Sequence, residues 1–296
     1  MKKILLPTDF SDNAYNAIKY AVELFKNDEC TFYLLNTYTP VIYDAEYVLY
    51  SPSHLTLGMI YKKNSQKGLA KVEKKIKKAF PNSKHKWELI SSFNMLNDEI
   101  KEQVNEKKID LVVMGTKGAT GADMILFGTH TVHAIKKGTC PVLAIPSGYK
   151  FETLKNILFP TDYFLNFSDK HLKFLKALSR KHTAKLHILN VFFGIPLEPE
   201  QEKTKKFLED YFKNIPHTFY SIEKGSVPEA IDDFQKNNPV DLLVMVNNKH
   251  SFFENILFRP VVNEIGFHVK IPFLVIPSEN HNSQKNEKYP SPYRFF

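Results

Sequence analysis

Residues 109–146 read IDLVVMGTKGATGADMILFGTHTVHAIKKGTCPVLAIP, and this stretch decides how the rest of the chain is interpreted. It contains two short apolar runs, at 111–114 and 142–145. Both have the length and the aliphatic content of strands that are buried in a parallel sheet. The stretch therefore predicts two parallel strands joined by a loop and a helix.

Glycines separate the first run from the predicted helix. Gly115 and Gly118 follow the run, and Gly128 precedes Thr129-His130-Thr131. Thr129 is the candidate N-cap, Val132 and Ile135 are expected on one helix face, and Gly138 is the candidate stop. Glycine lets the backbone approach a ligand closely, and the first amides of a helix point at an anion. We therefore expect a phosphate site here; the alternative is that the glycines only serve tight turns.

Two familiar phosphate motifs do not fit this pattern. The dinucleotide fingerprint needs glycines close together, and the P-loop ends in Gly-Lys-Ser/Thr. The pattern is instead G-x-x-G, nine residues, then G-T. It resembles the signature of the universal stress protein family, in its ATP-binding branch.

The bulk composition is that of a globular protein of two domains. The chain has 296 residues, of which 43% are hydrophobic and 24% charged, and domains of about 150 residues are typical. Its apolar runs are shorter than a membrane span, and its start has too short an apolar run for a signal peptide. Two cysteines support no disulfide framework, so we expect the cytoplasm. The net charge of +8 falls partly on lysine clusters that we interpret as solvated helix faces, and we expect neither nucleic acid nor membrane as a partner.

The chain repeats itself. KILLPTD at 3–9 returns as NILFPTD at 156–162, and DLVVM at 110–114 returns as DLLVM at 241–245. The offset is 153 for the first pair and 131 for the second, so the second copy is 22 residues shorter between them. We attribute most of this difference to loss of an excursion that follows the second strand. Self-similarity of this kind indicates a tandem duplication.

Apolar periodicity predicts alternating strands and helices in each copy. The pattern implies a doubly wound α/β sheet. The expected domains are 1–147 and 151–279, joined at 148–150 and followed by a flexible tail at 280–296. In the first copy, Ser11 or Asp12 is the expected cap of the first helix. The remaining expected segments of that copy are strands 2–7, 31–36 and 86–91, a partly ordered excursion at 37–64, and helices at 65–79 and 98–107.

The resemblance covers nearly the whole chain and implies an architecture. Each domain is then a Rossmann-like, five-stranded parallel sheet in the order 3-2-1-4-5, with helices on both faces. The family also implies that two lobes associate through their last strands, here near 142–145 and 273–276. One chain can satisfy that contact as an internal pseudo-dimer, and chains can associate further as homodimers.

The family's ATP site maps onto the first copy, at the crevice where strand order reverses between the first and fourth strands. Pro7, Thr8 and Asp9 then border the adenosine, Thr37 adds main-chain contacts to adenine, and Met114 packs near the nucleoside. The phosphates are wrapped by Gly115, Gly118, Gly128, Thr129, His130 and Thr131, with a charged contact from Lys117. Mg²⁺ or Mn²⁺ is expected to accompany ATP, or another adenine nucleotide, through the phosphates.

Several of these residues have a plainer interpretation. Asp9 can face the nucleoside, or it can make a turn and cap the first helix; the two roles are compatible. His130 and His133 have the spacing of a metal pair, but without a third ligand an exposed helix face is the better interpretation. Cys140 is expected to fill space before the last strand. We assign no catalytic residue and no metal ligand.

The second copy departs from the glycine pattern. At the offset of 131, the counterparts of Gly115, Gly118, Gly128 and Thr129 are Val246, Lys249, Arg259 and Pro260. Side chains then occupy the place where backbone must approach phosphate, and proline removes an amide donor. We expect no ATP in this half. Gly225 follows its third strand, where the first copy has Phe93-Asn94; the pattern offers no functional account of that exchange.

Three hypotheses of function follow. The first is a cytoplasmic, ATP-binding stress-response regulator with one site, acting on an unidentified regulatory protein. The second is a partner-binding scaffold that needs no nucleotide. The third is a slow ATPase or a nucleotidyl-transfer enzyme, although the Ser-Gly-Gly and His-x-Gly-His motifs of such relatives are absent and no general base is evident.

Overall fold

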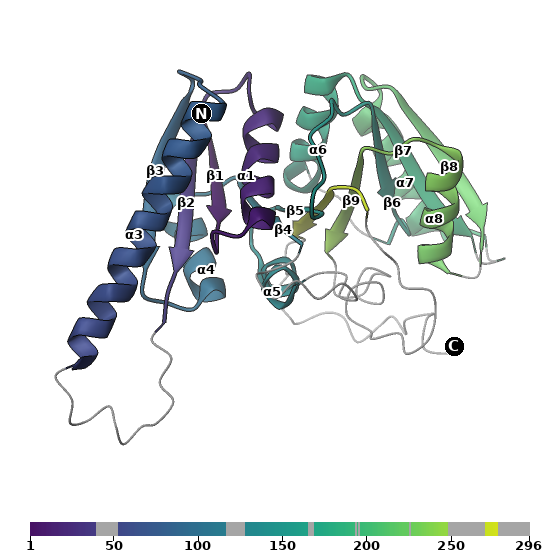
Figure 1. Cartoon of the computed structure of the whole chain (residues 1–296). Helices are drawn as coiled ribbons and strands as arrows, with labels where there is room; N and C mark the ends of the chain where they lie inside the picture. Colours follow the sequence, from purple (N-terminus) through teal and green to yellow (C-terminus); the bar gives the residue numbers. More distant parts are fainter. Residues whose placement is uncertain are drawn as a thin grey trace. The chain divides into compact units, whose positions relative to one another are not determined.

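The computed structural model describes residues 1–39, 53–116, 128–164, 169–192, 194, 196–224, 226–247 and 270–277. The side chains of 53–57 and 169–171 are outside this description. The chain forms two compact units, with the main division between Thr153 and Leu154. Figure 1 shows their elements, and each unit is treated by itself below.

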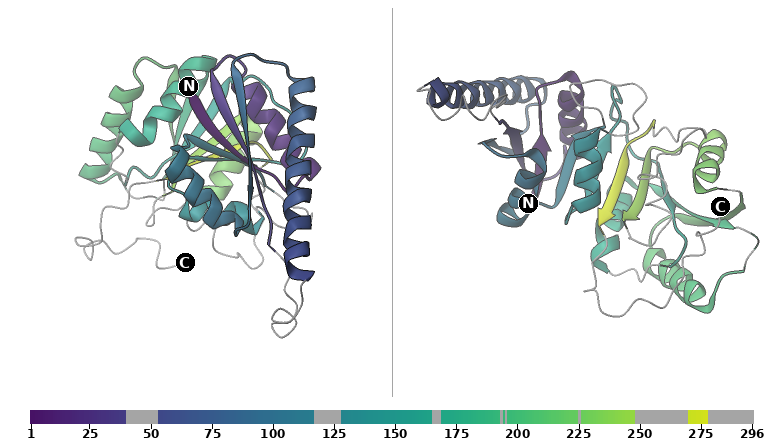
Figure 2. Two further views of the ribbon diagram at one scale, coloured as in Figure 1. Left: turned by 90° about the vertical axis from the view of Figure 1, so that its left-hand side faces the viewer. Right: turned by 90° about the horizontal axis from the view of Figure 1, so that it is seen from below.

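The first unit alternates strands and helices. Its strands are β1 (Lys2–Pro7), β2 (Cys30–Thr37), β3 (His85–Ser92), β4 (Leu111–Gly115) and β5 (Val142–Ile145). Its helices are α1 (Asp12–Leu24), α3 (Ser53–Ala79), α4 (Leu96–Lys107) and α5 (Thr129–Lys137). The strands are parallel in the order β3-β2-β1-β4-β5, as predicted. Helices cover both faces of this sheet, and α1 lies against β4 while α3 lies against β3 (Figure 2).

The second unit repeats this arrangement. Its strands are β6 (Asn156–Pro160), β7 (Lys185–Phe192), β8 (His217–Glu223), β9 (Leu242–Asn247) and β10 (Phe273–Pro277), and its helices are α6 (Asp169–His182), α7 (Pro199–Phe212) and α8 (Val227–Asn237). The order is β8-β7-β6-β9-β10, which is the same 3-2-1-4-5 pattern. The central strands are almost entirely buried, as their continuous apolar runs predict for a parallel sheet covered on both faces.

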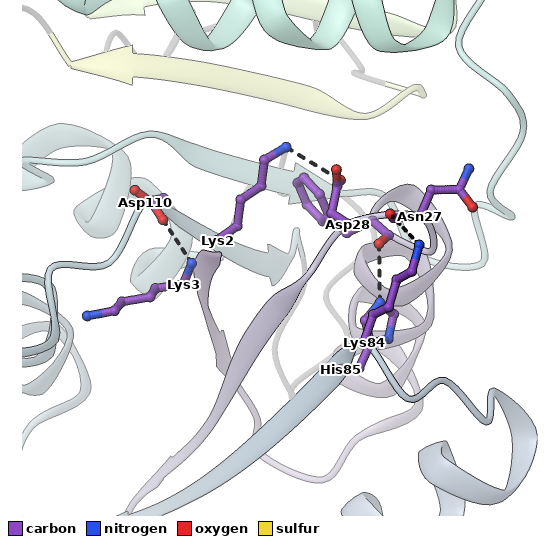
Figure 3. A network of polar contacts seen from close by, with 8 residues as sticks. Lys2, Lys3, Asn27, Asp28, Lys84, His85 and Asp110 are labelled. Atoms are coloured by element: carbon purple, nitrogen blue, oxygen red, sulfur yellow. Dashed lines mark hydrogen bonds and ion pairs between the residues drawn. The ribbon is translucent and has the colours of Figure 1, made fainter.

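In both units, two hydrogen bonds join the amino end of the first strand to the aspartate that precedes the fourth strand. The Lys3 amide donates to Asp110 Oδ2 at 2.8 Å (Figure 3). The Asp110 amide in turn donates to the Lys3 carbonyl. Asp241 makes the equivalent bonds to Asn156 in the second unit. This network ties the first strand to the beginning of the fourth. It lies at the opposite end of the strands from the predicted ligand edge and is therefore structural.

The predicted start of the second helix was wrong. We expected an excursion to residue 64, but α3 begins at Ser53 and has 27 residues, against 14 in α7. The turn-forming residues that suggested a loop end near Pro52, and residues after them are compatible with a helix. The helix, more than the connection before it, accounts for the shorter second copy. The part of the excursion at 40–52 and the tail at 278–296 lie outside the described residues.

The predicted N-cap of α1 is confirmed, whereas the predicted N-cap of α5 is wrong. Ser11 caps α1 as predicted, because its Oγ accepts from the Ala14 amide at 3.2 Å. Thr129 is not an N-cap: it is the first helical residue of α5, and Gly128 holds the cap position. The buried residues of α5 are Thr131, Ala134 and Ile135, and Val132 is partly exposed.

Gly138 ends α5, but it does not adopt the left-handed conformation that usually favours glycine at the end of a helix. Its φ of −64° is accessible to any residue, so a left-handed conformation is not required. A Cβ atom at this position would instead overlap the main-chain carbonyl oxygen of Ala134. The glycine is needed because the backbone folds closely over the last turn of the helix.

Candidate functional site

Several of the described residues that were predicted to bind ligand lie at the carboxyl ends of β1 and β4. These strands are neighbours, and the chain leaves them in opposite directions along the sheet. Such a reversal of strand order leaves a crevice that is the usual ligand position in open α/β sheets. Pro7 and Gly115 are the last residues of the two strands, so both were correctly placed at this edge.

The turn after β1 is fixed by its own side chains. The Thr8 hydroxyl accepts from the Phe10 amide at 3.0 Å, and Asp9 Oδ1 accepts from the Ser11 amide at 3.0 Å. Phe10 has a φ of 67°, which is rare for a bulky residue and needs such support. Asp9 therefore stabilises the turn, which was one of the two roles predicted for it. Its side chain is exposed at this edge of the sheet.

Asn36 joins this turn to β2. Its side-chain amide donates to the Thr8 carbonyl at 2.7 Å, and the Thr8 amide donates to the Leu35 carbonyl at 2.8 Å. Thr37, the residue predicted near adenine, ends β2 immediately beyond Asn36 and is partly exposed. The bond fixes the turn relative to the end of β2. Sequence reasoning missed Asn36.

The loop between β4 and α5 is closed at its base. The Gly128 amide donates to the Thr116 carbonyl at 2.5 Å, and the Thr116 amide donates to the Ile145 carbonyl at 3.0 Å. The Thr131 hydroxyl donates to the Gly115 carbonyl at 2.9 Å. These bonds hold the first turn of α5 against the end of β4. Lys117 and Gly118 belong to the part of this loop outside the described residues, so their predicted roles stay predictions.

The N-terminus of α5 has the character of an anion site. The first amides of a helix have no acceptor within it, and the helix dipole adds partial positive charge there. Gly128 is the N-cap, and no side chain among the described residues caps the helix. Thr129 and His130 are exposed, whereas Thr131 is buried and its hydroxyl is already used by Gly115. The backbone amides of Thr129 and His130 lie at this N-terminus, and their predicted contact with phosphate stays a prediction.

Two further residues define this edge. A Cβ atom on Gly115 would overlap the side-chain amide of Asn13, which projects from the first turn of α1. The absence of a side chain at Gly115 therefore makes room for Asn13 in the crevice, a role that sequence reasoning missed. Met114 is 6% exposed, so its side chain belongs mainly to the core.

The second unit has the same turn after its first strand, and there a residue of α7 bonds to it. The Thr161 hydroxyl accepts from the Tyr163 amide at 3.1 Å, Asp162 Oδ1 accepts from the Phe164 amide at 3.1 Å, and the Asn190 side chain donates to the Thr161 carbonyl at 3.0 Å. Gln201 of α7 donates to the Asp162 carbonyl at 2.7 Å. This bond brings the N-terminus of α7 against the end of β6.

Burial sets Asp162 apart from Asp9. The Asp162 side chain is buried, and desolvation raises the pKa of its carboxyl to about 6, although a backbone amide bond lowers it in part. Val246 holds the place of Gly115 and is also buried. Lys249, Arg259, Pro260 and Gly225 lie outside the described residues, so their predicted effects stay predictions.

Other kinds of site receive no support from the described residues. Among them, no group of three His, Cys, Asp or Glu side chains could hold a metal ion. His130 is exposed and His133 partly exposed on α5. No helix in the described part of the chain is long and apolar enough to cross a membrane. Cys140 is buried before β5, and burial raises the pKa of its thiol to about 12.

Comparison with known proteins agrees with this architecture. Universal stress protein MJ0531 of Methanocaldococcus jannaschii is 32% identical over 151 residues, which cover 49% of this chain and 81% of the relative. MJ0577 of the same organism is 30% identical over 157 residues, covering 49% and 94%. Each of these relatives thus matches about half of the chain.

Solved structures extend the likeness to the whole chain. A universal stress protein from Archaeoglobus fulgidus has a TM-score of 0.64 at 18% identity, covering 93% of this chain and 98% of that one. A structure described as a putative universal stress protein from Pseudomonas aeruginosa has a TM-score of 0.53 at 12% identity, covering 94% and 93%. These likenesses establish the fold. The model of the Universal stress protein family matches residues 1–146 and again 153–277, so the chain belongs to this family and carries two of its domains in tandem.

Proposed function

We propose that this protein is a cytoplasmic stress-response regulator that binds one adenine nucleotide, ATP, in its first unit. The observation that carries the proposal is the joining of Thr131 to Gly115, which holds an uncapped helix N-terminus at the reversal of strand order. Such an N-terminus favours phosphate over neutral ligands. The nucleotide acts as the signal, and the unit that binds it acts on a regulatory protein.

In this proposal the two ends of the ligand lie on different elements. The phosphates meet the backbone amides at Thr129 and His130, together with Lys117 and Gly118 of the loop. The nucleoside faces Thr8, Asp9 and Thr37. Asp9 is exposed and a carboxylate repels phosphate, so the ribose or base side suits it better. Mg²⁺ or Mn²⁺ accompanies the phosphates and neutralises part of their charge.

Isothermal titration calorimetry with Mg-ATP tests the proposal. The full-length protein is expected to bind one equivalent. Gly115→Val copies the residue of the second unit, Val246, and is expected to weaken binding at least tenfold because a branched side chain enters the crevice beside Asn13. Gly118→Val is expected to act in the same direction from the loop.

Gly58→Ala is the matched control. Gly58 lies in α3, where an added Cβ atom would meet nothing within 4 Å, so this variant should bind ATP as the wild type does. Thermal unfolding of each variant separates lost binding from lost fold. Absence of binding by the wild type, or equal binding by wild type and both valine variants, would reject the assignment.

We also propose that the second unit serves as a binding scaffold without nucleotide. The Gln201 bond to Asp162 and the buried Val246 support this proposal, since both fill the edge at which the first unit presents open backbone. The measured stoichiometry decides it. Two equivalents of ATP per chain would contradict a scaffold role, and one equivalent is expected.

A further inference from the structure

An aromatic pair, one ring of which is exposed and the other partly exposed, lies at the carboxyl ends of β2 and β3. Thr37 and Ser92 are partners in the parallel register, and Tyr38 and Phe93 are the residues that follow them. The two rings lie 5.8 Å apart at 57°, and Phe93 is 62% exposed. The Tyr38 amide donates to the Ser92 carbonyl at 3.0 Å, so the backbone of the pair is continuous with the sheet.

A buried glutamate holds the loop that presents Phe93. Glu99 of α4 is 4% exposed, and its Oε2 accepts from the Ser92 hydroxyl at 2.7 Å and from the Asn94 amide group at 3.0 Å. Gln103 donates to the other oxygen at 2.9 Å. The residues on both sides of Phe93 are therefore fixed to one carboxylate. A buried carboxylate is costly unless it is hydrogen-bonded, so this arrangement is a built feature of the loop.

The described residues of the second unit include neither an equivalent carboxylate nor an equivalent aromatic pair. At the offset of 131, Glu99 corresponds to Ala230 and Gln103 to Phe234, and both counterparts are buried apolar residues. The residue that follows β8 is Lys224, which is paired with Asp233 at 2.5 Å. Within the described part of the chain, this combination of a buried carboxylate and an aromatic pair is found in the unit that has the glycine pattern. This is the exchange of Phe93-Asn94 for Gly225 that had no account from the sequence.

We propose that Phe93, backed by Tyr38, stacks on the base of the bound nucleotide; this inference rests on the proposed function. Tyr38 directly follows Thr37, the residue assigned to the adenine end, so the pair lies beside that end of the ligand. A purine has a flat π-face that stacks on aromatic rings without needing hydrogen bonds. Stacking also removes water from a phenyl ring that is otherwise largely exposed. The ligand class selected is a nucleotide with a purine base, in preference to a polyphosphate alone.

Calorimetry on four full-length proteins tests the inference: wild type, Phe93→Ala, Phe93→Tyr and Phe207→Ala. Phe207 of α7 is the matched control, because it is 38% exposed and its ring lies 5.7 Å from that of Tyr211. Phe93→Ala is expected to weaken Mg-ATP binding about 5- to 150-fold, the usual range for loss of one base-stacking ring. Phe93→Tyr keeps the π-face and should stay within about twofold of the wild type. Phe207→Ala should bind as the wild type does.

A second measurement follows the ring itself. Indole fluorescence of Phe93→Trp is expected to fall on addition of Mg-ATP by more than the wild-type signal does, and not to fall with magnesium tripolyphosphate. Wild-type affinity in Phe93→Ala, or no additional quenching in Phe93→Trp, would overturn the inference while leaving nucleotide binding intact. Failure of the wild type to bind ATP would reject the proposed function and this inference together.

Discussion

Asn36 and Thr8 are joined by a hydrogen bond of 2.7 Å from the side-chain amide of Asn36 to the main-chain carbonyl of Thr8. Asn190 and Thr161 repeat it at 3.0 Å in the second unit. The two units have lost similarity in their glycine pattern but share this bond. The bond therefore belongs to the turn after the first strand and does not depend on the glycine pattern.

Removing this bond is expected to destabilise both units, and the second more than the first. Asn190 is 5% exposed, so Asn190→Ala leaves a buried carbonyl without its partner and should lower the free energy of unfolding by about 1–3 kcal/mol. Asn36→Ala should cost about 1 kcal/mol, because water can replace the lost donor at the partly exposed turn. Urea unfolding measures both. A larger loss in Asn36→Ala than in Asn190→Ala would contradict this account.

Two glycines should respond in opposite directions to the same substitution. Gly138→Ala places a methyl group against the Ala134 carbonyl and is expected to destabilise the protein by about 1–3 kcal/mol. Gly58→Ala adds a methyl group to an open helical site and should stabilise it by about 0.5–1 kcal/mol. Thermal unfolding of the two variants side by side checks the prediction. Equal shifts would show that the close approach at Gly138 is not what selects glycine there.

Asp162 is expected to make stability depend on pH. Its pKa in the folded protein, about 6, lies above the ordinary value of 3.8, so between these values the folded state binds more protons than the unfolded state. The free energy of unfolding should therefore fall as pH rises through that window and stay lower above it. Asp162→Asn removes this loss and should be more stable than the wild type at pH 7.5, by at most about 3 kcal/mol.

The matched control for this prediction is Asp9→Asn, at the same position of the first turn but exposed. Urea unfolding at pH 4 and at pH 7.5 compares the variants. Asp162→Asn should gain stability relative to the wild type between the two conditions, and Asp9→Asn should change much less. A pH dependence that persists unchanged in Asp162→Asn would show that other groups cause it.

The cysteines are expected to be unreactive in the native protein. Cys30 and Cys140 are both buried, and the raised pKa of the Cys140 thiol leaves almost no thiolate at pH 8. Ellman's reagent should therefore label neither thiol within minutes in buffer and both in guanidinium chloride. Rapid labelling of Cys140 in the native state would argue for a redox role in place of packing.

The sequence alone determined which segments are strands and that the chain is duplicated. Continuous apolar runs such as 111–114 and 142–145 identify buried parallel strands because both faces of the sheet are covered. Local side-chain chemistry narrowed the cap of the first helix to Ser11 or Asp12, and the structure shows that it is Ser11. The start of α3 was missed because helix propensity is weak and turn-forming residues nearby outweighed it. The glycine spacing that distinguishes the first unit from the second was also visible in the sequence.

Only the tertiary structure decided how these segments form an edge that can bind a ligand. Asn36 reaches Thr8 across 28 residues, and Gln201 reaches Asp162 across 39, so neither bond has a signature within one segment. The burial of Asp162 and the bonds from Glu99 to the residues beside Phe93 likewise have no signature within one segment of the sequence. Periodicity and propensity are properties of neighbours along the chain, whereas desolvation and hydrogen bonding depend on which distant residues the fold brings into contact.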